Sequence, residues 1–206
     1  MPPKFIYFDL GNVLLFFDHA LASRQMAEVA GVSEARVREA IFDSGLQWQY
    51  EAGQLDSRQF YEEFCRRTET HPDYGALAHA AGAIFRVNAS IKPVVAQLAG
   101  AGYRLGLLSN TCEMHWDYFA SGRYAMIPEI FAAVTLSFRV GAMKPDAKIY
   151  AAAAELAGVR PEDIFFTDDT PGHVAAANAC GYDAVHYTDT PTLVRALHDR
   201  GVRFNY

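Results

Sequence analysis

Five short, mainly apolar runs are distributed along the chain, and each has the length of a buried β-strand. They span residues 5–8, 103–108, 132–136, 164–167 and 183–187. Continuous apolar runs are typical of parallel strands that helices cover on both faces. In the second half of the chain these runs alternate with helical patterns. That alternation predicts a doubly wound, Rossmann-like parallel sheet of the α/β class.

Between the first two runs, residues 16–89 carry helical patterns and no convincing strand. Asp56, with Gln59 three residues later, has the spacing of a capping box at the start of one of these helices. The first strand precedes this segment and all the others follow it. We therefore expect a helical bundle inserted into one core domain. The core would comprise residues 1–15 and 90–206, and the inserted cap residues 16–89.

The composition is that of a globular protein. The chain has 206 residues, of which 51% are hydrophobic, enough for a sizeable core. Its net charge of -6 and its lack of a Lys/Arg cluster argue against nucleic acid or an anionic membrane as a partner, since such binding rests on neutralising phosphates. Polar residues interrupt the N-terminal apolar run, so it resembles neither a signal peptide nor a membrane span. We expect a cytoplasmic protein. Three widely spaced cysteines match neither a disulfide framework nor a zinc site.

Polar side chains that could carry chemistry follow the ends of four of the apolar runs. In chain order they are Asp9, Ser109 with Asn110, Lys144, and the pair Asp168 and Asp169. Open α/β sheets bind ligands outside the carboxyl ends of their strands, so we expect these groups to meet at one edge of the sheet. Taken singly, several of them could be helix caps or surface groups. Two adjacent carboxylates after an apolar strand, however, repel each other unless a cation or a raised pKa relieves them.

In order and setting, these residues resemble the motifs of the haloacid dehalogenase superfamily, and the resemblance spans essentially the whole chain. The segments Asp-Leu-Gly-Asn-Val, Ser-Asn-Thr, Lys-Pro-Asp-Ala-Lys-Ile-Tyr and Phe-Phe-Thr-Asp-Asp-Thr-Pro are similar to those of its metal-dependent phosphatases, among them phosphatases of glucose 1-phosphate. This resemblance implies a Rossmann-like core and a helical cap that covers the site and recognises the substrate. It also implies that the substrate is a small phosphorylated metabolite, with a sugar phosphate favoured.

The resemblance further implies a role for each motif residue. Asp9 would attack the phosphoryl group and form an aspartyl phosphate that water then hydrolyses. Mg²⁺ would neutralise the charge that keeps a carboxylate away from an anionic phosphoryl group. Its ligands would be Asp9, Asp168, Asp169 and the backbone carbonyl of Gly11. The phosphoryl oxygens would be bound by Ser109, Asn110 and Lys144.

Gly11 departs from the pattern of the superfamily. Most of its phosphatases place a second Asp at this position as general acid and base, a role worth about 10²–10⁴ in rate. Without that group, the enzyme could act on a better leaving group such as an anomeric phosphate, use another acid, or be slow. The candidate acids, each of which could also be an ordinary loop residue, are Asp18, His19, His115 and His173. The neighbouring Asn12 replaces the usual glycine of the turn, and Asn enters the left-handed region more readily than most residues.

Substrate selection is expected to lie with the cap. Trp48 and Tyr50, in the segment Gln-Trp-Gln-Tyr-Glu, could stack on a sugar and hydrogen-bond to it. Ordinary helix packing would explain the same two aromatic residues. The sequence does not decide between these alternatives.

Two other functions fit part of the pattern. One is a 2-haloacid dehalogenase of the same superfamily, in which the Asp attacks carbon without a metal; the adjacent carboxylates argue against it. The other is a catalytically weak or inactive binding protein, which Gly11 suggests. Retention of Asp9, Lys144 and Asp169 disfavours that alternative, because a binding protein needs no nucleophile. A monomer and a homodimer are both compatible with the sequence.

Overall fold

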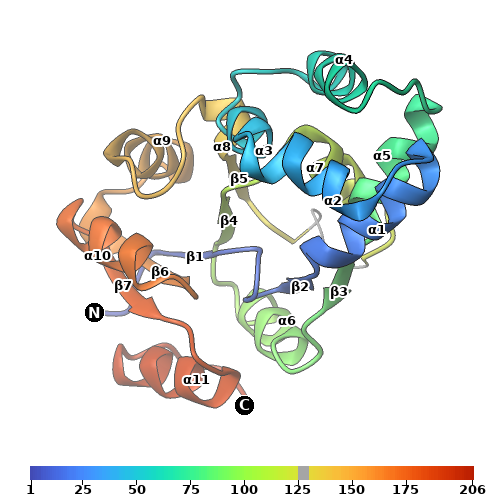
Figure 1. Ribbon diagram of the computed structural model, residues 1–206. Helices are drawn as coiled ribbons and strands as arrows, with labels where there is room; N and C mark the ends of the chain where they lie inside the picture. Colours follow the sequence, from blue (N-terminus) through green and yellow to red (C-terminus); the bar gives the residue numbers. More distant parts are fainter. Residues whose placement is uncertain (125–129) are drawn as a thin grey trace.

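The computed structural model describes residues 1–124 and 130–206. Its core is a five-stranded parallel sheet with the strand order β5-β4-β1-β6-β7 (Figure 1). The strands are β1 (Phe5–Phe8), β4 (Leu105–Ser109), β5 (Ala133–Leu136), β6 (Ile164–Asp168) and β7 (Asp183–His186). The chain runs outward from β1 to β4 and β5 and then crosses back to β6 and β7. The doubly wound α/β sheet predicted from the sequence is confirmed.

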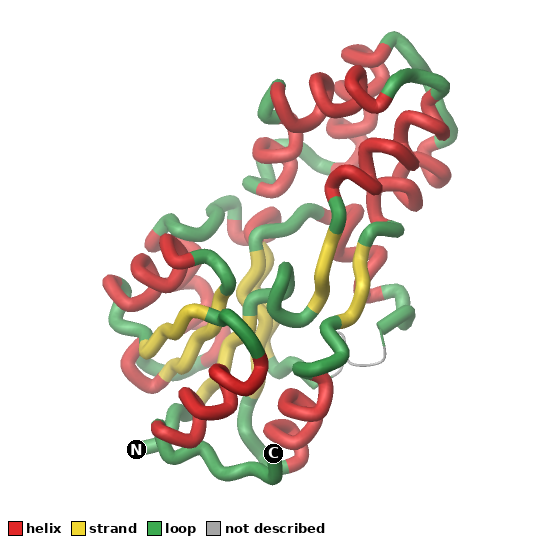
Figure 2. The backbone as a smooth tube through the Cα atoms, turned by 60° about the horizontal axis from the view of Figure 1, so that its bottom comes forward, coloured by secondary structure: helices red, strands yellow, loops and turns green. Residues whose placement is uncertain are grey.

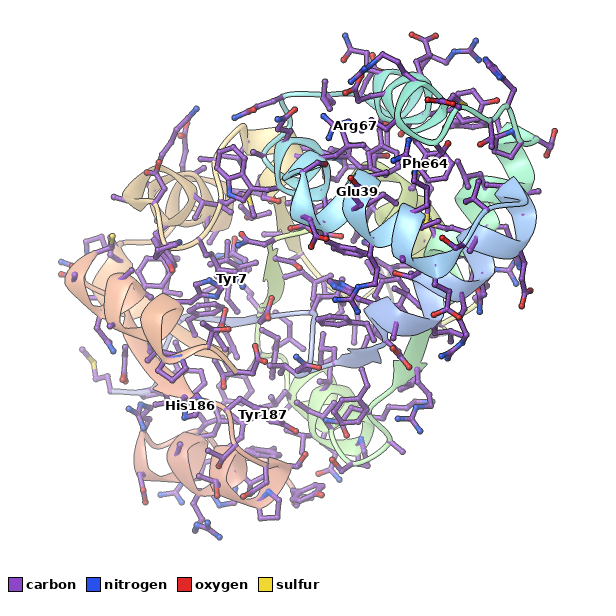
Figure 3. The ribbon with its side chains drawn as sticks, viewed as in Figure 1. Tyr7, Glu39, Phe64, Arg67, His186 and Tyr187 are labelled. Atoms are coloured by element: carbon purple, nitrogen blue, oxygen red, sulfur yellow. The ribbon has the colours of Figure 1, made fainter. Side chains whose placement is uncertain are left out.

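Helices cover both faces of this sheet. They are α6 (Lys92–Gly100), α7 (Glu113–Ala120), α8 (Ser137–Val140), α9 (Ala147–Ala157), α10 (Pro171–Ala179) and α11 (Thr190–Asp199), with a short 3-10 turn at Pro161–Asp163. Ile6 and Phe8 pack on one face against α6, α7 and α11, while Phe5 and Tyr7 pack on the other against α9 and α10. Tyr7, labelled in Figure 3, donates its hydroxyl hydrogen to the carbonyl of Ala153 at 2.9 Å. Burial on both faces explains why the first apolar run is continuous.

The segment between β1 and β4 forms the inserted helical bundle. Its elements are α1 (His19–Ala30), α2 (Glu34–Arg38), a π-helical turn (Glu39–Asp43), α3 (Leu46–Glu51), α4 (Ser57–Thr68) and α5 (Tyr74–Gly82). Asp56 and Gln59 make the predicted capping box at the start of α4. The bundle has its own hydrophobic cluster, which includes Phe64, labelled in Figure 3. Figure 2 shows these helices grouped at one end of the molecule, away from the two termini.

Two short strands connect the bundle to the core, and the sequence analysis missed them. β2 (Leu15–Phe17) pairs antiparallel with β3 (Phe85–Val87), in a segment where we expected only helices. Each strand has three residues, too few to show an alternating pattern, and β2 follows directly on an apolar stretch that looked like the end of the first strand. The predicted boundary between residues 15 and 16 falls inside β2, and the one at 89/90 lies just beyond β3.

The bundle is also docked on the core through buried polar contacts. The hydroxyl of Tyr50, on α3, accepts a hydrogen bond from the backbone N–H of Met114 at 2.9 Å and lies 2.6 Å from Oγ of Ser57. Ser57 in turn donates to the carboxylate of Glu113. Cys112 and Met114 pack into the hydrophobic cluster of the bundle. The cap is therefore held against α7 as well as by its two connecting strands.

No helix among the described residues is long and apolar enough to cross a membrane. The three cysteines are free thiols; Cys65 and Cys112 are buried, and Cys180 is half-buried.

Tyr50→Phe should weaken the docking of the cap. The phenyl ring keeps its stacking on Phe60, at 4.6 Å between centroids, but the buried N–H of Met114 loses its acceptor. An unsatisfied buried donor costs about 1–3 kcal/mol, and we expect that decrease in the free energy of unfolding measured in urea. Tyr61→Phe is the matched control, because its hydroxyl donates to the half-buried carbonyl of Pro72 within the cap and makes no contact with α7 among the described residues. Equal losses for both variants would contradict the docking role.

Candidate active site

The carboxyl ends of β1, β4 and β6 bring the motif residues together around one cavity. Asp9 follows β1, Ser109 is the last residue of β4, and Asp168 is the last residue of β6. The cavity has a volume of about 220 Å³. Its lining includes Asp9, Gly11, Ser109, Asn110, Lys144 and Asp169 from the predicted set, together with Phe17, His19, Glu51, Phe85, His115, Phe119 and His173. Residues far apart in the sequence thus meet at one edge of the sheet, on the side that the cap covers.

A buried ammonium group lies at the centre of this arrangement. Nζ of Lys144 is 2.7 Å from Oδ1 of Asp9, 2.5 Å from Oδ2 of Asp168 and 3.0 Å from the carbonyl oxygen of Leu108. These three acceptors use the three donor hydrogens of a lysine ammonium group. Lys144 is 3% exposed and Asp168 is fully buried. The sequence left open whether Lys144 was a surface residue, and the structure places it inside the site.

Asn110 positions Lys144 through the lysine backbone. Its side-chain oxygen accepts from the N–H of Lys144 at 2.8 Å, and its side-chain nitrogen donates to the carbonyl of the same residue at 2.9 Å. Both ends of the Asn110 amide are therefore occupied. The side chain of Asn110 therefore positions Lys144, and the predicted binding of a phosphoryl oxygen in the Asn110 region stays a prediction. The hydroxyl of Ser109 lines the cavity with one long bond, at 3.3 Å, to the carbonyl of Asn110.

The three charged groups shift one another's pKa values. Burial raises the pKa of Asp9 to about 6, against the opposing effect of Lys144, and the nearby Asp168 adds to the rise. Burial also raises the pKa of Asp168, but Lys144 and His173 outweigh it and bring that pKa down to about 2. For Lys144, the two carboxylates outweigh burial and raise the pKa. The cluster carries one more carboxylate than ammonium groups, so it favours an additional cation.

The carboxylates beside the cavity form a set of hard oxygen donors. Ligand oxygens of Asp9, Asp168 and Asp169 all lie within 4.8 Å of one another. Asp168 is already engaged by Lys144, by the N–H of Thr170 at 2.8 Å and by Nδ1 of His173 at 3.1 Å. Within the described residues, Oδ2 of Asp9 has no hydrogen-bond partner. This donor set suits a small divalent cation such as Mg²⁺, with Asp9 and Asp169 as the ligands least occupied by protein contacts.

The turn after β1 aims Asp169 toward the same point. Nδ2 of Asn12 donates to Oδ2 of Asp169 at 2.9 Å. Asn12 itself has a φ of 54°, in the left-handed region that Asn tolerates better than most residues. Its predicted suitability for this turn agrees with that conformation. Gly11, one residue earlier, also lines the cavity.

A family model identifies the protein family to which this fold belongs. The model of the haloacid dehalogenase-like hydrolases matches residues 3–181. The chain belongs to this family of hydrolases. Two structures of similar size resemble this hydrolase closely in fold. A haloacid dehalogenase family enzyme of Bacteroides thetaiotaomicron, in complex with magnesium and inorganic phosphate, has a TM-score of 0.82 at 21% identity, over 93% of this chain and 98% of the other.

The second is a predicted hydrolase of the same family from Porphyromonas gingivalis, with a TM-score of 0.80 at 26% identity, over 96% of this chain and 98% of the other. A 2-haloacid dehalogenase of Pseudomonas syringae is less similar, with a TM-score of 0.65 at 18% identity, over 91% and 86% of the two chains. The fold of this hydrolase is therefore shared with an enzyme crystallised with magnesium and inorganic phosphate and with a 2-haloacid dehalogenase.

Phe17 occupies the space that a side chain at position 11 would need. A Cβ atom built on Gly11 would lie 2.9 Å from Cε1 of Phe17 and 4.0 Å from Oδ2 of Asp9. Phe17 belongs to an aromatic wall of the cavity that continues through Phe85, at 6.3 Å between ring centroids, to Phe119, a further 4.4 Å away. The missing carboxylate of this hydrolase is thus replaced by an apolar ring rather than by open space.

Of the four candidate acids named from the sequence, three reach the cavity. Asp18 does not line it; its side chain caps α1 by accepting from the N–H groups of Ala20 and Leu21. His19 and His115 line the aromatic wall. Burial lowers the pKa of His19, and burial together with the nearby His19 lowers the pKa of His115 to about 4. Both imidazoles are therefore neutral at physiological pH, whereas His173 is engaged by Asp168.

The predicted substrate contacts of the cap are not brought to the cavity. Trp48 is 56% exposed and Tyr50 is 1% exposed, and neither lines it. Tyr50 instead holds the cap on α7, so helix packing explains it, as the sequence analysis allowed. The next residue, Glu51, is the one in this segment that reaches the cavity. Consecutive helical positions point about 100° apart, so choosing the correct residue of the segment required the helix orientation.

Lys144→Met should destabilise the protein strongly at mildly alkaline pH, where both neighbouring carboxylates are ionised. Removing one partner of a buried ionic cluster leaves uncompensated charge and costs about 3–5 kcal/mol in the free energy of unfolding. Urea denaturation measures this cost. Lys148→Met is the control, since Lys148 is exposed on α9 and its loss should change the stability by less than about 0.5 kcal/mol. A decrease below about 1 kcal/mol for Lys144→Met would show that the cluster is not the buried ionic network described above.

Proposed function

We propose that this hydrolase is a Mg²⁺-dependent phosphomonoesterase that acts on a small phosphorylated metabolite through a phosphorylated Asp9. The observation that carries the proposal is the site at the carboxyl edge of the sheet, where Lys144 bonds to Asp9 and the ligand oxygens of Asp9, Asp168 and Asp169 lie within 4.8 Å of one another. The complex of the B. thetaiotaomicron enzyme with magnesium and inorganic phosphate supports it by analogy of fold. The proposed cation ligands are Asp9, Asp169 and the carbonyl of Gly11, with Asp168 beside them.

Bound Mg²⁺ would supply positive charge next to the phosphoryl oxygens and so reduce their repulsion of the nucleophile. The protein side chains do the rest. Oδ2 of Asp9, which is free of protein partners among the described residues, attacks phosphorus. Lys144 donates a hydrogen bond to the other oxygen of Asp9, and its ammonium group places a fixed positive charge beside the phosphoryl group. Ser109 can turn its hydroxyl from the long bond to Asn110 toward a phosphoryl oxygen. Water then releases phosphate and regenerates the carboxylate of Asp9.

The volume and the aromatic lining of the cavity favour a small substrate that contains a ring. Its volume of about 220 Å³ is below the roughly 300–1,000 Å³ of sites for drug-sized ligands. Phe17, Phe85 and Phe119 form an apolar, aromatic wall of the same cavity, together with the two neutral imidazoles. Such a wall packs well against the apolar faces of a sugar ring. A sugar phosphate is accordingly the substrate class that we favour.

A dehalogenase function is less consistent with the charges of the site. A carboxylate that attacks carbon in a haloacid needs no cation, whereas Asp9, Asp168 and Asp169 present three carboxylates with only one ammonium group among them. The excess negative charge would repel a haloacid carboxylate. An additional divalent cation removes this obstacle for a phosphate ester.

Asp9→Asn should abolish phosphate release from p-nitrophenyl phosphate and from a panel of sugar phosphates, lowering kcat/KM by at least about 10³ because the nucleophile is lost. EDTA should silence the wild-type enzyme, and added Mg²⁺ should restore it. Asp43→Asn, an exposed change in the cap, is the control and should leave the rate unchanged. Activity that survives in EDTA would refute the metal requirement. Halide release from 2-haloacids without phosphate release would establish the dehalogenase alternative instead.

A further inference from the structure

Gly11 has no side chain that could protonate the leaving oxygen, whereas other phosphatases of the superfamily have an acid at this position. The ring of Phe17 lies where a side chain at position 11 would begin, 2.9 Å from the Cβ position. A proton donor must therefore reach the leaving oxygen from another wall of the cavity. Outside the charged cluster, the titratable residues that line the cavity are His19, Glu51, His115 and His173.

His19 and His115 are poorly suited to donate a proton, and His173 is engaged by Asp168. Burial lowers the pKa values of His19 and His115, so both have lost their extra proton at neutral pH. Nδ1 of His173 lies 3.1 Å from Oδ1 of Asp168, on the side of the carboxylates. Glu51 is the remaining group, and it approaches the cavity from the cap, at the end of α3.

Hydrogen bonds hold the backbone of Glu51 next to residues 109–111, the loop that includes the proposed phosphoryl-binding residues Ser109 and Asn110. The hydroxyl of Ser137, which is fully buried, lies 2.6 Å from the carbonyl oxygen of Glu51 and 3.0 Å from that of Thr111. The same hydroxyl accepts from the N–H of Thr111 at 2.9 Å. One side chain thus joins Glu51 of the cap to the residue that lies two positions after Ser109. Thr111 and Glu51 both line the cavity, so this contact holds Glu51 beside the loop of residues 109–111.

A close backbone approach fixes the same cap segment on the core. Gly53, two residues after Glu51, has a φ of 69°, and a Cβ atom there would lie 2.3 Å from the carbonyl oxygen of Phe138. Only a glycine fits such a contact between the cap and α8. The position of Glu51 over the cavity is therefore built into the fold.

The side chain of Glu51 has one protein partner and one free oxygen. Nε2 of Gln47 donates to Oε1 at 2.8 Å, while Oε2 accepts no hydrogen bond within the part of the chain that the structure describes. Burial raises the pKa of Glu51, although the bond from Gln47 opposes the rise. The other groups that face it are Cys112, whose pKa burial raises so that the thiol is uncharged, and, across the cavity, the charged pair Lys144 and Asp9. Glu51 can therefore carry a proton nearer to neutral pH than an exposed carboxyl group.

Resting on the proposed phosphatase function, we infer that Glu51 is the catalytic residue that donates a proton to the leaving oxygen in place of the residue missing at Gly11. As the bond between phosphorus and Asp9 forms, the bond from phosphorus to the leaving oxygen breaks, its electron pair stays on that oxygen, and the proton of Glu51 moves there. The Glu51 carboxylate then takes a proton from the water that attacks the phosphorylated Asp9. The bond between Asp9 and phosphorus breaks, phosphate leaves, and both carboxyl groups return to their starting forms.

The test compares two substrates of similar shape whose leaving groups differ in acidity. p-Nitrophenolate is stable enough to leave as an anion. The benzyl oxygen, by contrast, must receive a proton as it leaves, so that the product is benzyl alcohol. Glu51→Gln keeps the size of the side chain but cannot donate an acidic proton. It should lower kcat/KM for benzyl phosphate by about 10²–10⁴ and that for p-nitrophenyl phosphate by less than about tenfold. Glu28→Gln, an exposed change on α1, is the matched control and should alter neither value.

A pH profile provides a second readout that a structural role of Glu51 would not produce. With benzyl phosphate, kcat of the wild-type enzyme should fall as pH rises through the pKa of Glu51, and Glu51→Gln should remove this dependence. Equal losses on both substrates, or no loss on benzyl phosphate, would overturn the assignment. Failure of the phosphatase function itself would look different, because the wild-type enzyme would then release no phosphate from p-nitrophenyl phosphate with Mg²⁺ present.

Discussion

The active site depends on one buried ammonium group placed between two carboxylates. Nζ of Lys144 bonds to Asp9 and Asp168, which lie at the ends of the adjacent strands β1 and β6. The pairing brings like charges together that would otherwise repel, and the remaining negative charge is what favours a divalent cation. Removing the lysine would therefore affect both the stability of the fold and the charge state of Asp9. The same interaction explains why Asn110 spends both ends of its amide on the backbone of Lys144 instead of on a ligand.

The sheet and the order of its motifs were predictable because their signals are local. Continuous apolar runs identify strands buried on both faces, and the rule that parallel strands bind ligands at their carboxyl ends placed the polar residues at a common edge. The capping box at Asp56 is equally local, and the structure reproduces it. β2 and β3 were missed since each has only three residues and their pairing joins positions about seventy residues apart, between Leu15 and Val87.

What the sequence could not supply is the orientation of side chains on the cap. Trp48, Tyr50 and Glu51 belong to one short helix, and only its packing decides that Trp48 faces solvent, Tyr50 binds α7 and Glu51 lines the cavity. The structure shows that Gly53 permits the contact with α8 that fixes this helix. The absence of an acid at Gly11 was visible in the sequence, but its replacement by the ring of Phe17 depends on the path of the chain from the turn after β1 into β2.

These contacts make the cap a structural part of the active site. The cavity has a charged floor from the core, formed by Asp9 and Lys144, and an aromatic wall in which Phe17 and Phe85 come from the two connecting strands. A displacement of the cap relative to the core would therefore alter both the shape of the cavity and the position of Glu51. Because the hydroxyl of Ser137 bonds to the cap and to the loop after Ser109, a displacement of α3 would also disturb the loop that contains Asn110 and Thr111. The docking of the cap and the conformation of residues 109–111 are thus coupled through the buried side chain of Ser137.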